Sequence, residues 1–542
     1  MIKNKEKLGV QFVYLSFVFY FLFHNLKYFY LGLVESFSKV PFADSWNALS
    51  DLSKARNPFS IEYLWLPSNE HRLFLQRLFY SLNSKFFDGN ELNLTLLHLL
   101  IVLITAGLLS FLYSRTLNQI RWSLFFLALM ELTNFKFNSI NLIWNYQLNF
   151  FLAILFPIIV FMFFEKFQRN QTYLNLFYLL VSLPILILIN ASGVIAIISL
   201  LSVLIFANIS FLKKSLIATY AAFLVFLYIS PASQNQSFDL LSQATFTIQY
   251  FFIYLGSPFM HVFNLFDSEI SSKDTTQSLL IGMLFFCIFI SLTYFSTIIN
   301  FYSPSNLTIF VLHLYLLLIP VFASVKRVDF GLTHAFAQSY LTFSGLMILS
   351  SVFLVFRFLF SIHFGPFKNF SSYALLLGIA FILYQSQTTS SVIYDNFGFY
   401  KNKAALGLIF GVNDPKTMAS IYPVDNKSTI PAEVTEWLTN NKSGYVENFY
   451  DVEYIWDEVR EKFCAKGTFI KELIVHDKVG VIELEMQLPR NVSYNLVSVI
   501  AKNGRLGLVK FPNEFAENEN SYWGYLDPDE KETLQNVLDC GN

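Results

Sequence analysis

The chain has 542 residues, of which 54% are hydrophobic, 18% aromatic and 14% charged. A soluble protein carries about 25% charged residues, so this composition argues against a soluble domain over the whole length. The net charge of −1, without a basic stripe, argues against a nucleic-acid partner. Apolar runs extend to about residue 387, and charged residues then return to ordinary density. We therefore expect a membrane domain over 1–387 and a soluble domain over 388–542.

Apolar stretches of about 20 residues predict membrane-spanning helices. We expect about eleven, near 9–31, 93–113, 120–133, 147–164, 173–189, 192–211, 215–230, 278–299, 307–324, 340–360 and 372–386. The first follows a basic start but is too long for a signal-peptide core and has no cleavage site, so we interpret it as an uncleaved span. The apolar segment 246–266 is broken by Gly256, Ser257 and Pro258. We interpret it as interfacial or re-entrant; if it spans, everything after it inverts.

Lysine and arginine in short loops favour the cytoplasmic side. With the N-terminus inside, the cytoplasmic turns hold Arg115, Arg121, Lys166, Arg169, Lys213, Lys214, Arg357 and Lys368. The opposite turns hold Lys136 and the exceptional pair Lys326–Arg327. We therefore expect the loop 35–92 and the C-terminal domain to be extracytoplasmic. The richness in Phe, Ile, Asn and Lys is typical of an AT-rich bacterial genome, which would make this a bacterial cytoplasmic (inner) membrane.

Asp44 follows closely on the first span, which places its carboxylate near the membrane surface. Asp44 and Ser45 either cap a helix over 46–55 or present a catalytic base or metal ligand at the lipid–water boundary.

The run Asn69-Glu70-His71-Arg72 is the densest polar cluster of the membrane half. Apolar residues then recur at helical spacing, which predicts an amphipathic helix lying in the interface: Leu75, Leu78, Phe79, Leu82 and Phe86. Glu70 and His71 would occupy its first turn, where the helix dipole favours a carboxylate. The cluster either caps this helix or belongs to a binding site that it shares with Asp44.

A second polar cluster runs from Val325 to His334, between the ninth and tenth spans. It is either a solvated turn, with Asp329 as counter-ion of the two cations, or an anion site for a phosphate at headgroup level. Lys326 and Arg327 would supply a compact charge and a fork of donors to that phosphate. The spans themselves are nearly free of charge, which argues against an ion-driven carrier.

The C-terminal domain reads as mixed α and β. Strand patterns cover 478–488 and 494–501, Asn503-Gly504 predicts a hairpin turn, and 431–438 and 452–463 read as helices. Trp437, Tyr522 and Trp523 are either core aromatics or platforms for sugar rings. Cys464 and Cys540 are either a disulfide or two free thiols, and Cys287, inside an apolar run, is expected to be buried.

An Asp just after the first span, an interfacial helix in the first outside loop, a multispan body and an outside C-terminal domain together resemble the GT-C glycosyltransferases. The runs Asn69-Glu70-His71-Arg72 and Arg327-Val328-Asp329-Phe330-Gly331 also resemble little-characterised bacterial members of that superfamily. The acidic pair of the mannosyltransferases and the WWD-type motif of the oligosaccharyltransferases are missing from the sequence, which leaves the acceptor and any metal open.

The resemblance implies that a sugar moves, with inversion, from a polyprenyl-phosphate donor to a cell-envelope glycan or lipid acceptor. Asp44 would then be the catalytic base, and Arg72, Lys326 and Arg327 would stabilise the leaving phosphate. Glu70 and His71 would bind the sugar or help hold a divalent cation, which the sequence does not require. Arg77, Asp329 and His334 are further candidates for donor binding.

Two other functions are also compatible with the sequence. An O-antigen ligase or polymerase also uses extracytoplasmic Arg and His near a lipid phosphate, but usually has its large domain between spans. A lipid or polysaccharide transporter would require a polar pathway through the bundle.

Overall fold

The computed structural model describes residues 2–36, 40–68, 71–87, 89–114, 121–229, 243–263, 265, 270–297, 303–361, 367–388, 395–412, 418–422, 430–441, 452–455, 470–476, 481–487, 496–501, 504–510 and 521–528. The chain divides into two compact units. The first comprises residues 1–30, 64–76 and 96–390, and the second comprises 31–63, 77–95 and 391–542. The second unit thus includes residues 391–542 together with most of the loop 35–92.

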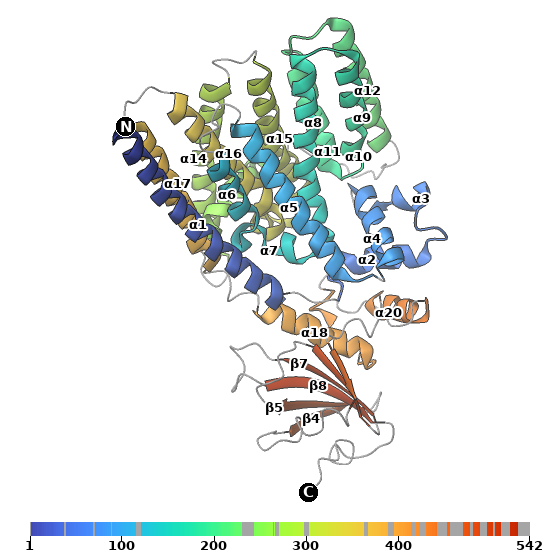
Figure 1. Cartoon of the computed structure of the whole chain (residues 1–542). Helices are drawn as coiled ribbons and strands as arrows, with labels where there is room; N and C mark the ends of the chain where they lie inside the picture. The colour runs from blue at the N-terminus through green and yellow to red at the C-terminus, as the bar shows by residue number, and fades with distance from the viewer. Residues whose placement is uncertain are drawn as a thin grey trace. The chain divides into compact units, whose positions relative to one another are not determined.

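The first unit is a bundle of apolar helices (Figure 1). Each expected span has a helix at its place: α1 (Ile2–Ser36), α5 (Glu91–Ser114), α6 (Arg121–Leu132), α8 (Leu148–Arg169), α9 (Tyr173–Ser182) with α10 (Pro184–Ile187), α11 (Ala191–Leu204), α12 (Phe211–Ile229), α14 (Ser272–Thr297), α15 (Pro304–Arg327), α16 (Gln338–Ser361) and α17 (Phe367–Thr388). Among the described residues, six helices are long and apolar enough to cross a membrane, and three apolar helices are shorter. The chain is therefore a multi-pass helical membrane protein, and the number of eleven spans stays a prediction.

Helix α8 lies at the centre of one group of helices, where it packs against α9, α11 and α15 (Figure 1). Its inward side chains include Phe151, Phe161, Phe164 and Phe167, each fully buried. Aromatic side chains bury large apolar areas, so this face contributes strongly to packing. Pro157 lies inside the helix without ending it, as is tolerated where neighbouring helices surround the freed carbonyl.

The predicted break at 256–258 is wrong, because α13 (Ala244–Val262) runs through Pro258 as one helix. Pro258 has no backbone N–H to donate to the carbonyl of Tyr254. The hydroxyl of Ser257 donates a hydrogen bond of 3.1 Å to that carbonyl instead. Gly256 and Gly282 let α13 and α14 approach closely, since a Cβ on Gly282 would lie 1.8 Å from the carbonyl oxygen of Phe252. Gly256, which belongs to the predicted break, therefore serves close helix packing.

Cys287 lies on an exposed face of α14, so the expectation that it is buried is also wrong. An apolar run does not reveal which side of a helix packs inward, and α14 exposes many large apolar side chains, such as Leu280, Leu284 and Ile288. Such a face is suited to contact lipid.

The second unit contains α2 (Asp44–Lys54), α3 (Ile61–Leu64), α18 (Asp395–Ile409), α20 (Ile430–Asn441) and a six-stranded sheet. The strands are β3 (Val452–Ile455), β4 (Ile470–His476), β5 (Val481–Gln487), β6 (Leu496–Ala501), β7 (Gly504–Lys510) and β8 (Ser521–Pro528), in the order β3-β6-β7-β8-β5-β4. All neighbours are antiparallel except β3 and β6. Helix α18 packs on β7 and β8 (Figure 1).

The expected strands near 478–488 and 494–501 are present, and Ala501 pairs with Gly504 at the predicted hairpin. The predicted helix over 452–463 is wrong at its start, where Val452–Ile455 forms β3. The alternation of Val, Glu, Tyr and Ile suits a strand beside β6 better than a helix. Tyr522 and Trp523 are buried, as the core interpretation required, and the side chain of Trp437 lies outside the described residues.

Candidate functional site

Asp44 is the first residue of α2, and its side chain is half-buried. Nδ2 of Asn47 donates a hydrogen bond of 3.3 Å to Oδ1 of Asp44. The hydroxyl of Tyr422 in turn donates to Oδ1 of Asn47 at 2.8 Å. Burial raises the pKa of Asp44, and the hydrogen bond from Asn47 opposes this rise. A carboxylate with a raised pKa, oriented by a neighbouring amide, is suited to take a proton.

The residue before Asp44 has a strained backbone. Ala43 has φ 48° and ψ −123°, and it is the one non-glycine residue with positive φ in the described part of the chain. Its amide donates to the carbonyl of Ile421 at 2.6 Å. Strain of this kind costs about 1–3 kcal/mol and is concentrated at functional sites. It marks the start of α2 as a position that the surrounding structure holds in place.

A buried lysine lies near the same segment. Lys401 of α18 is 2% exposed, and its Nζ lies 5.7 Å from the ring centroid of Phe42. Burial lowers the pKa of Lys401 to about 8, while the carboxylate of Glu91 acts in the opposite direction. No local sequence pattern singled out Lys401, because it lies in a helix of ordinary polar composition.

Arg77 lies on α4 (Phe74–Phe86) and forms an ion pair with Asp51. Its Nη2 lies 2.8 Å from Oδ2 of Asp51, and its guanidinium lies 5.1 Å from the ring centroid of Tyr63. The interpretation that best fits these contacts is structural, since Arg77 holds two segments of the second unit together.

Helix α4 buries its polar side and leaves its apolar stripe half-exposed. Gln76, Arg77 and Ser81 are at most 3% exposed, whereas Leu75, Leu78 and Leu82 are half-exposed. A surface helix of a soluble protein would instead bury its apolar side. The burial pattern of α4 therefore fits a helix whose apolar side contacts lipid. The helix begins at Phe74, so the prediction that His71 lies in its first turn is wrong.

His71 and Arg72 instead form β2 (His71–Arg72), which pairs with β1 (Pro67–Ser68) in a small hairpin of the first unit. Arg72 is 5% exposed. Its Nη1 donates to the carbonyl of Trp65 at 2.7 Å, and its Nε donates to the carbonyl of Tyr228 at 3.1 Å. The guanidinium also lies 5.2 Å from the ring centroid of Trp65.

Arg72 is a buried cation, and no carboxylate among the described residues bonds it. Its Nη2 also has no hydrogen-bond partner among these residues. An isolated buried cation is costly unless an anion or further hydrogen bonds compensate it. A phosphate oxygen would supply both, because a guanidinium offers donors in a planar fork.

The second polar cluster follows α15 in the first unit. Lys326 is exposed in the last turn of α15, and Arg327 places its guanidinium 5.5 Å from the ring centroid of Phe330. Asp329 accepts a hydrogen bond of 2.8 Å from Nε2 of Gln243. Gly331 has φ 90° and ψ 161°, a conformation that favours glycine, and this turn presents Phe330 with 61% exposure.

His334 completes this cluster. Its ring stacks on Phe330, with centroids 5.1 Å apart, and its Nδ1 shares a hydrogen bond of 3.1 Å with the hydroxyl of Tyr250. Burial lowers the pKa of His334, and Arg327 acts in the same direction. A cation, an exposed aromatic ring and a neutral imidazole thus lie within one surface cluster, which is suited to a sugar ring and an anion.

The structure therefore distributes the predicted residues between its two units. Asp44 and Arg77 belong to the second unit, whereas His71, Arg72, Lys326, Arg327, Asp329 and His334 belong to the first. Arg327, Phe330 and His334 are in contact, and Arg72 makes its contacts with Trp65 and Tyr228. Glu70, Cys464 and Cys540 lie outside the described residues. In the described part of the chain, no three His, Cys, Asp or Glu side chains form a group that could hold a metal.

Sequence reasoning also missed buried ionisable side chains in the helices. Glu131 of α6 is 3% exposed, and neither of its carboxylate oxygens has a hydrogen-bond partner among the described residues. It lies so close to α16 that a Cβ on Gly345 would be 2.5 Å from its Oε1. His98 and His313 are buried as well. The bundle is therefore less free of ionisable groups than the sequence suggested.

No protein-family model and no curated protein sequence matches the chain. The function is therefore argued from the residues alone.

Proposed function

We propose that this protein is a membrane glycosyltransferase that moves a sugar from a polyprenyl-phosphate donor to a cell-envelope glycan or lipid acceptor. The observation that carries the proposal is Asp44, a half-buried carboxylate with a raised pKa, held by Asn47 beside the strained Ala43. Among the described residues it has no ion-pair partner, so its charge is available for chemistry.

In the proposed reaction, Asp44 accepts the proton of an acceptor hydroxyl. The acceptor oxygen forms a bond to the anomeric carbon while the bond from that carbon to the phosphate oxygen breaks. The electron pair of the broken bond leaves with the polyprenyl phosphate, and the anomeric carbon is inverted. No redox partner is needed.

The leaving phosphate requires positive charge that is already in place. Arg72 supports this role, because its buried guanidinium has a free Nη2 and no bonded carboxylate among the described residues. The cluster of Arg327, Phe330 and His334 supports binding of a donor that combines a sugar ring with a phosphate. Under this proposal, the transfer takes place at the extracytoplasmic side of a bacterial inner membrane.

The proposal is tested by incubating the purified, detergent-solubilised protein with a panel of radiolabelled polyprenyl-phosphate sugars. We expect sugar release from at least one donor, and release by a Glu62→Gln variant at the wild-type rate. Glu62 is an exposed acid of the loop 35–92, to which Asp44 also belongs. It is therefore a matched control for Asp44. Release from no donor in the panel would contradict the proposal.

A transporter is the second candidate, and the buried Glu131 is the observation that favours it. Unpaired carboxylates inside a helix bundle often mark ion or proton pathways. A transporter would lose function in a Glu131→Gln variant, whereas the glycosyltransferase should keep sugar release in that variant.

A further inference from the structure

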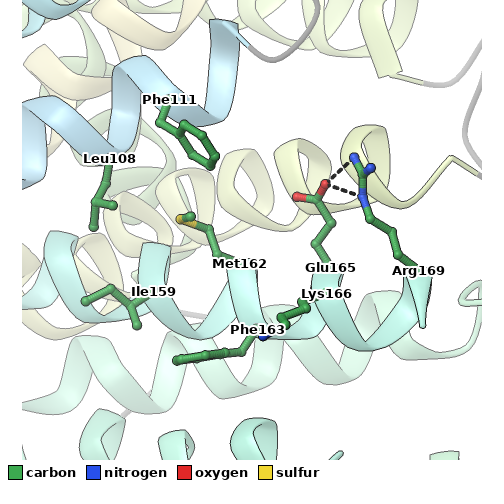
Figure 2. A pocket seen from close by; sticks show the side chains of 8 residues that line it. All are labelled: Leu108, Phe111, Ile159, Met162, Phe163, Glu165, Lys166 and Arg169. Carbon is green, nitrogen blue, oxygen red and sulfur yellow. Dashed lines mark hydrogen bonds and ion pairs between the residues drawn. The ribbon is translucent and has the colours of Figure 1, made fainter. Parts of the chain in front are cut away.

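Helices α5 and α8 border a groove of about 650 Å³ in the first unit, which Figure 2 shows from close by. Leu108 and Phe111 come from α5, and the other lining residues come from the second half of α8: Ile159, Met162, Phe163, Glu165, Lys166 and Arg169. Both helices are long and apolar enough to cross a membrane. The groove therefore lies near the ends of two candidate spans.

The groove is divided chemically along its length. Its floor is apolar, and Leu108, Ile159 and Met162 are half-exposed there. Its end at the last turn of α8 holds two exposed cations, Lys166 and Arg169. An apolar channel that ends in positive charge matches an acyl chain joined to an anionic head group.

The charges at this end do not cancel. Glu165 is buried, with 1% of its side chain exposed, and Arg169 bonds it through Nε at 3.0 Å and Nη2 at 2.8 Å, as the dashed lines in Figure 2 mark. Ser305 donates a further hydrogen bond of 3.0 Å to the same carboxylate oxygen. Lys166 lies 5.3 Å from the ring centroid of Tyr178 and is in no ion pair among the described residues. Among the lining side chains, one positive charge therefore remains for a ligand.

We propose that this groove binds an anionic phospholipid, with an acyl chain along the apolar floor and the head-group phosphate at Lys166 and the outer edge of Arg169. The flexible stem of Lys166 lets its ammonium group follow a head group at the membrane surface. The site uses none of the residues assigned to sugar transfer, so it is a separate lipid site.

The test measures lipid that stays bound to the purified protein by native mass spectrometry, after incubation with equal amounts of phosphatidylglycerol and phosphatidylcholine. We expect the wild type to retain phosphatidylglycerol in preference to phosphatidylcholine. Lys166→Gln should lower that preference about fivefold, the value of one lysine near an anionic surface. This variant is preferred to an Arg169 variant, which would leave Glu165 buried without its cation.

Two further variants complete the design. Lys214→Gln removes a cation that instead bonds the carbonyl of Ile205, and it should keep the wild-type preference. Ile159→Trp should fill the floor and reduce retention of both lipids while all charges stay. The proposal is overturned if the wild type retains both lipids equally, if Lys166→Gln keeps the preference, or if Ile159→Trp retains lipid like the wild type.

Discussion

Asn47 links the candidate base to a distant part of the sequence. It donates to Asp44 and accepts from Tyr422, which is 375 residues away. A hydrogen bond to the charged form of a carboxylate lowers its pKa, so Asn47 partly offsets the rise that burial causes. The activity of Asp44 should therefore depend on this amide.

Asn47→Ala should move the acidic limb of the pH profile of kcat/KM to higher pH. The free enzyme's base must be deprotonated to act, and without the amide its pKa rises further. Tyr422→Phe should move the limb in the same direction by a smaller amount, because it removes only the hydrogen bond that orients the Asn47 amide. The check is a pH–rate series with all three proteins, and an acidic limb that stays in place in Asn47→Ala would remove Asn47 from this role.

Arg72→Lys should lower kcat/KM for the lipid donor by about 100-fold, the effect of losing one strong donor to a developing anion. Lysine keeps the charge but cannot bond Trp65, Tyr228 and a phosphate with one planar fork. Arg56→Lys serves as the control, because Arg56 is exposed. Steady-state kinetics at varied donor concentration measure the effect; an unchanged kcat/KM in Arg72→Lys would argue for a purely structural arginine.

At the scale of elements, the close contact of α13 and α14 depends on glycine. Gly282→Ala should lower stability by about 1–3 kcal/mol, as expected for overpacking, because its Cβ would meet the carbonyl of Phe252. Gly378→Ala is the matched control, since no atom lies within 4 Å of its Cβ position. It should be neutral or stabilising by up to about 1 kcal/mol. Thermal unfolding in detergent distinguishes the two, and equal midpoints would contradict the packing account.

Hydropathy predicted where the helices of the first unit lie, since lipid demands long apolar segments with internal hydrogen bonds. The break predicted in α13 was wrong, because Gly256 packs against a neighbouring helix that the sequence does not identify. In addition, Ser257 bonds the carbonyl of Tyr254, to which Pro258 cannot donate. The helix predicted over 452–463 was wrong at β3, because this strand pairs with β6, which is distant in the sequence. Local pattern therefore gave the elements, while packing between distant segments decided the exceptions.

At the scale of the whole molecule, the second compact unit groups residues that are far apart in the sequence. Residues 31–63 and 77–95 cluster with 391–542 because contacts such as Ala43 to Ile421 join them. The position of Asp44 after the first span was visible in the sequence. Its partners Asn47 and Tyr422, and the contacts of Arg72 with Tyr228, depend on long-range folding and carried no local signal.

If Asp44 is the base of a glycosyl transfer, its carboxylate is required for sugar release but not for folding. Sugar release from the lipid-linked donor is measured for wild type and Asp44→Asn together with the thermal unfolding of both. Burial raises the pKa of Asp44 in the folded state, so its contribution to stability is favourable at low pH and is lost as pH rises through that pKa. Replacing it with Asn should therefore raise the unfolding midpoint at neutral pH.

We expect Asp44→Asn to fold at least as stably as the wild type and to lose release by about 100-fold or more. A well-folded Asp44→Asn protein that releases sugar at the wild-type rate would contradict the account.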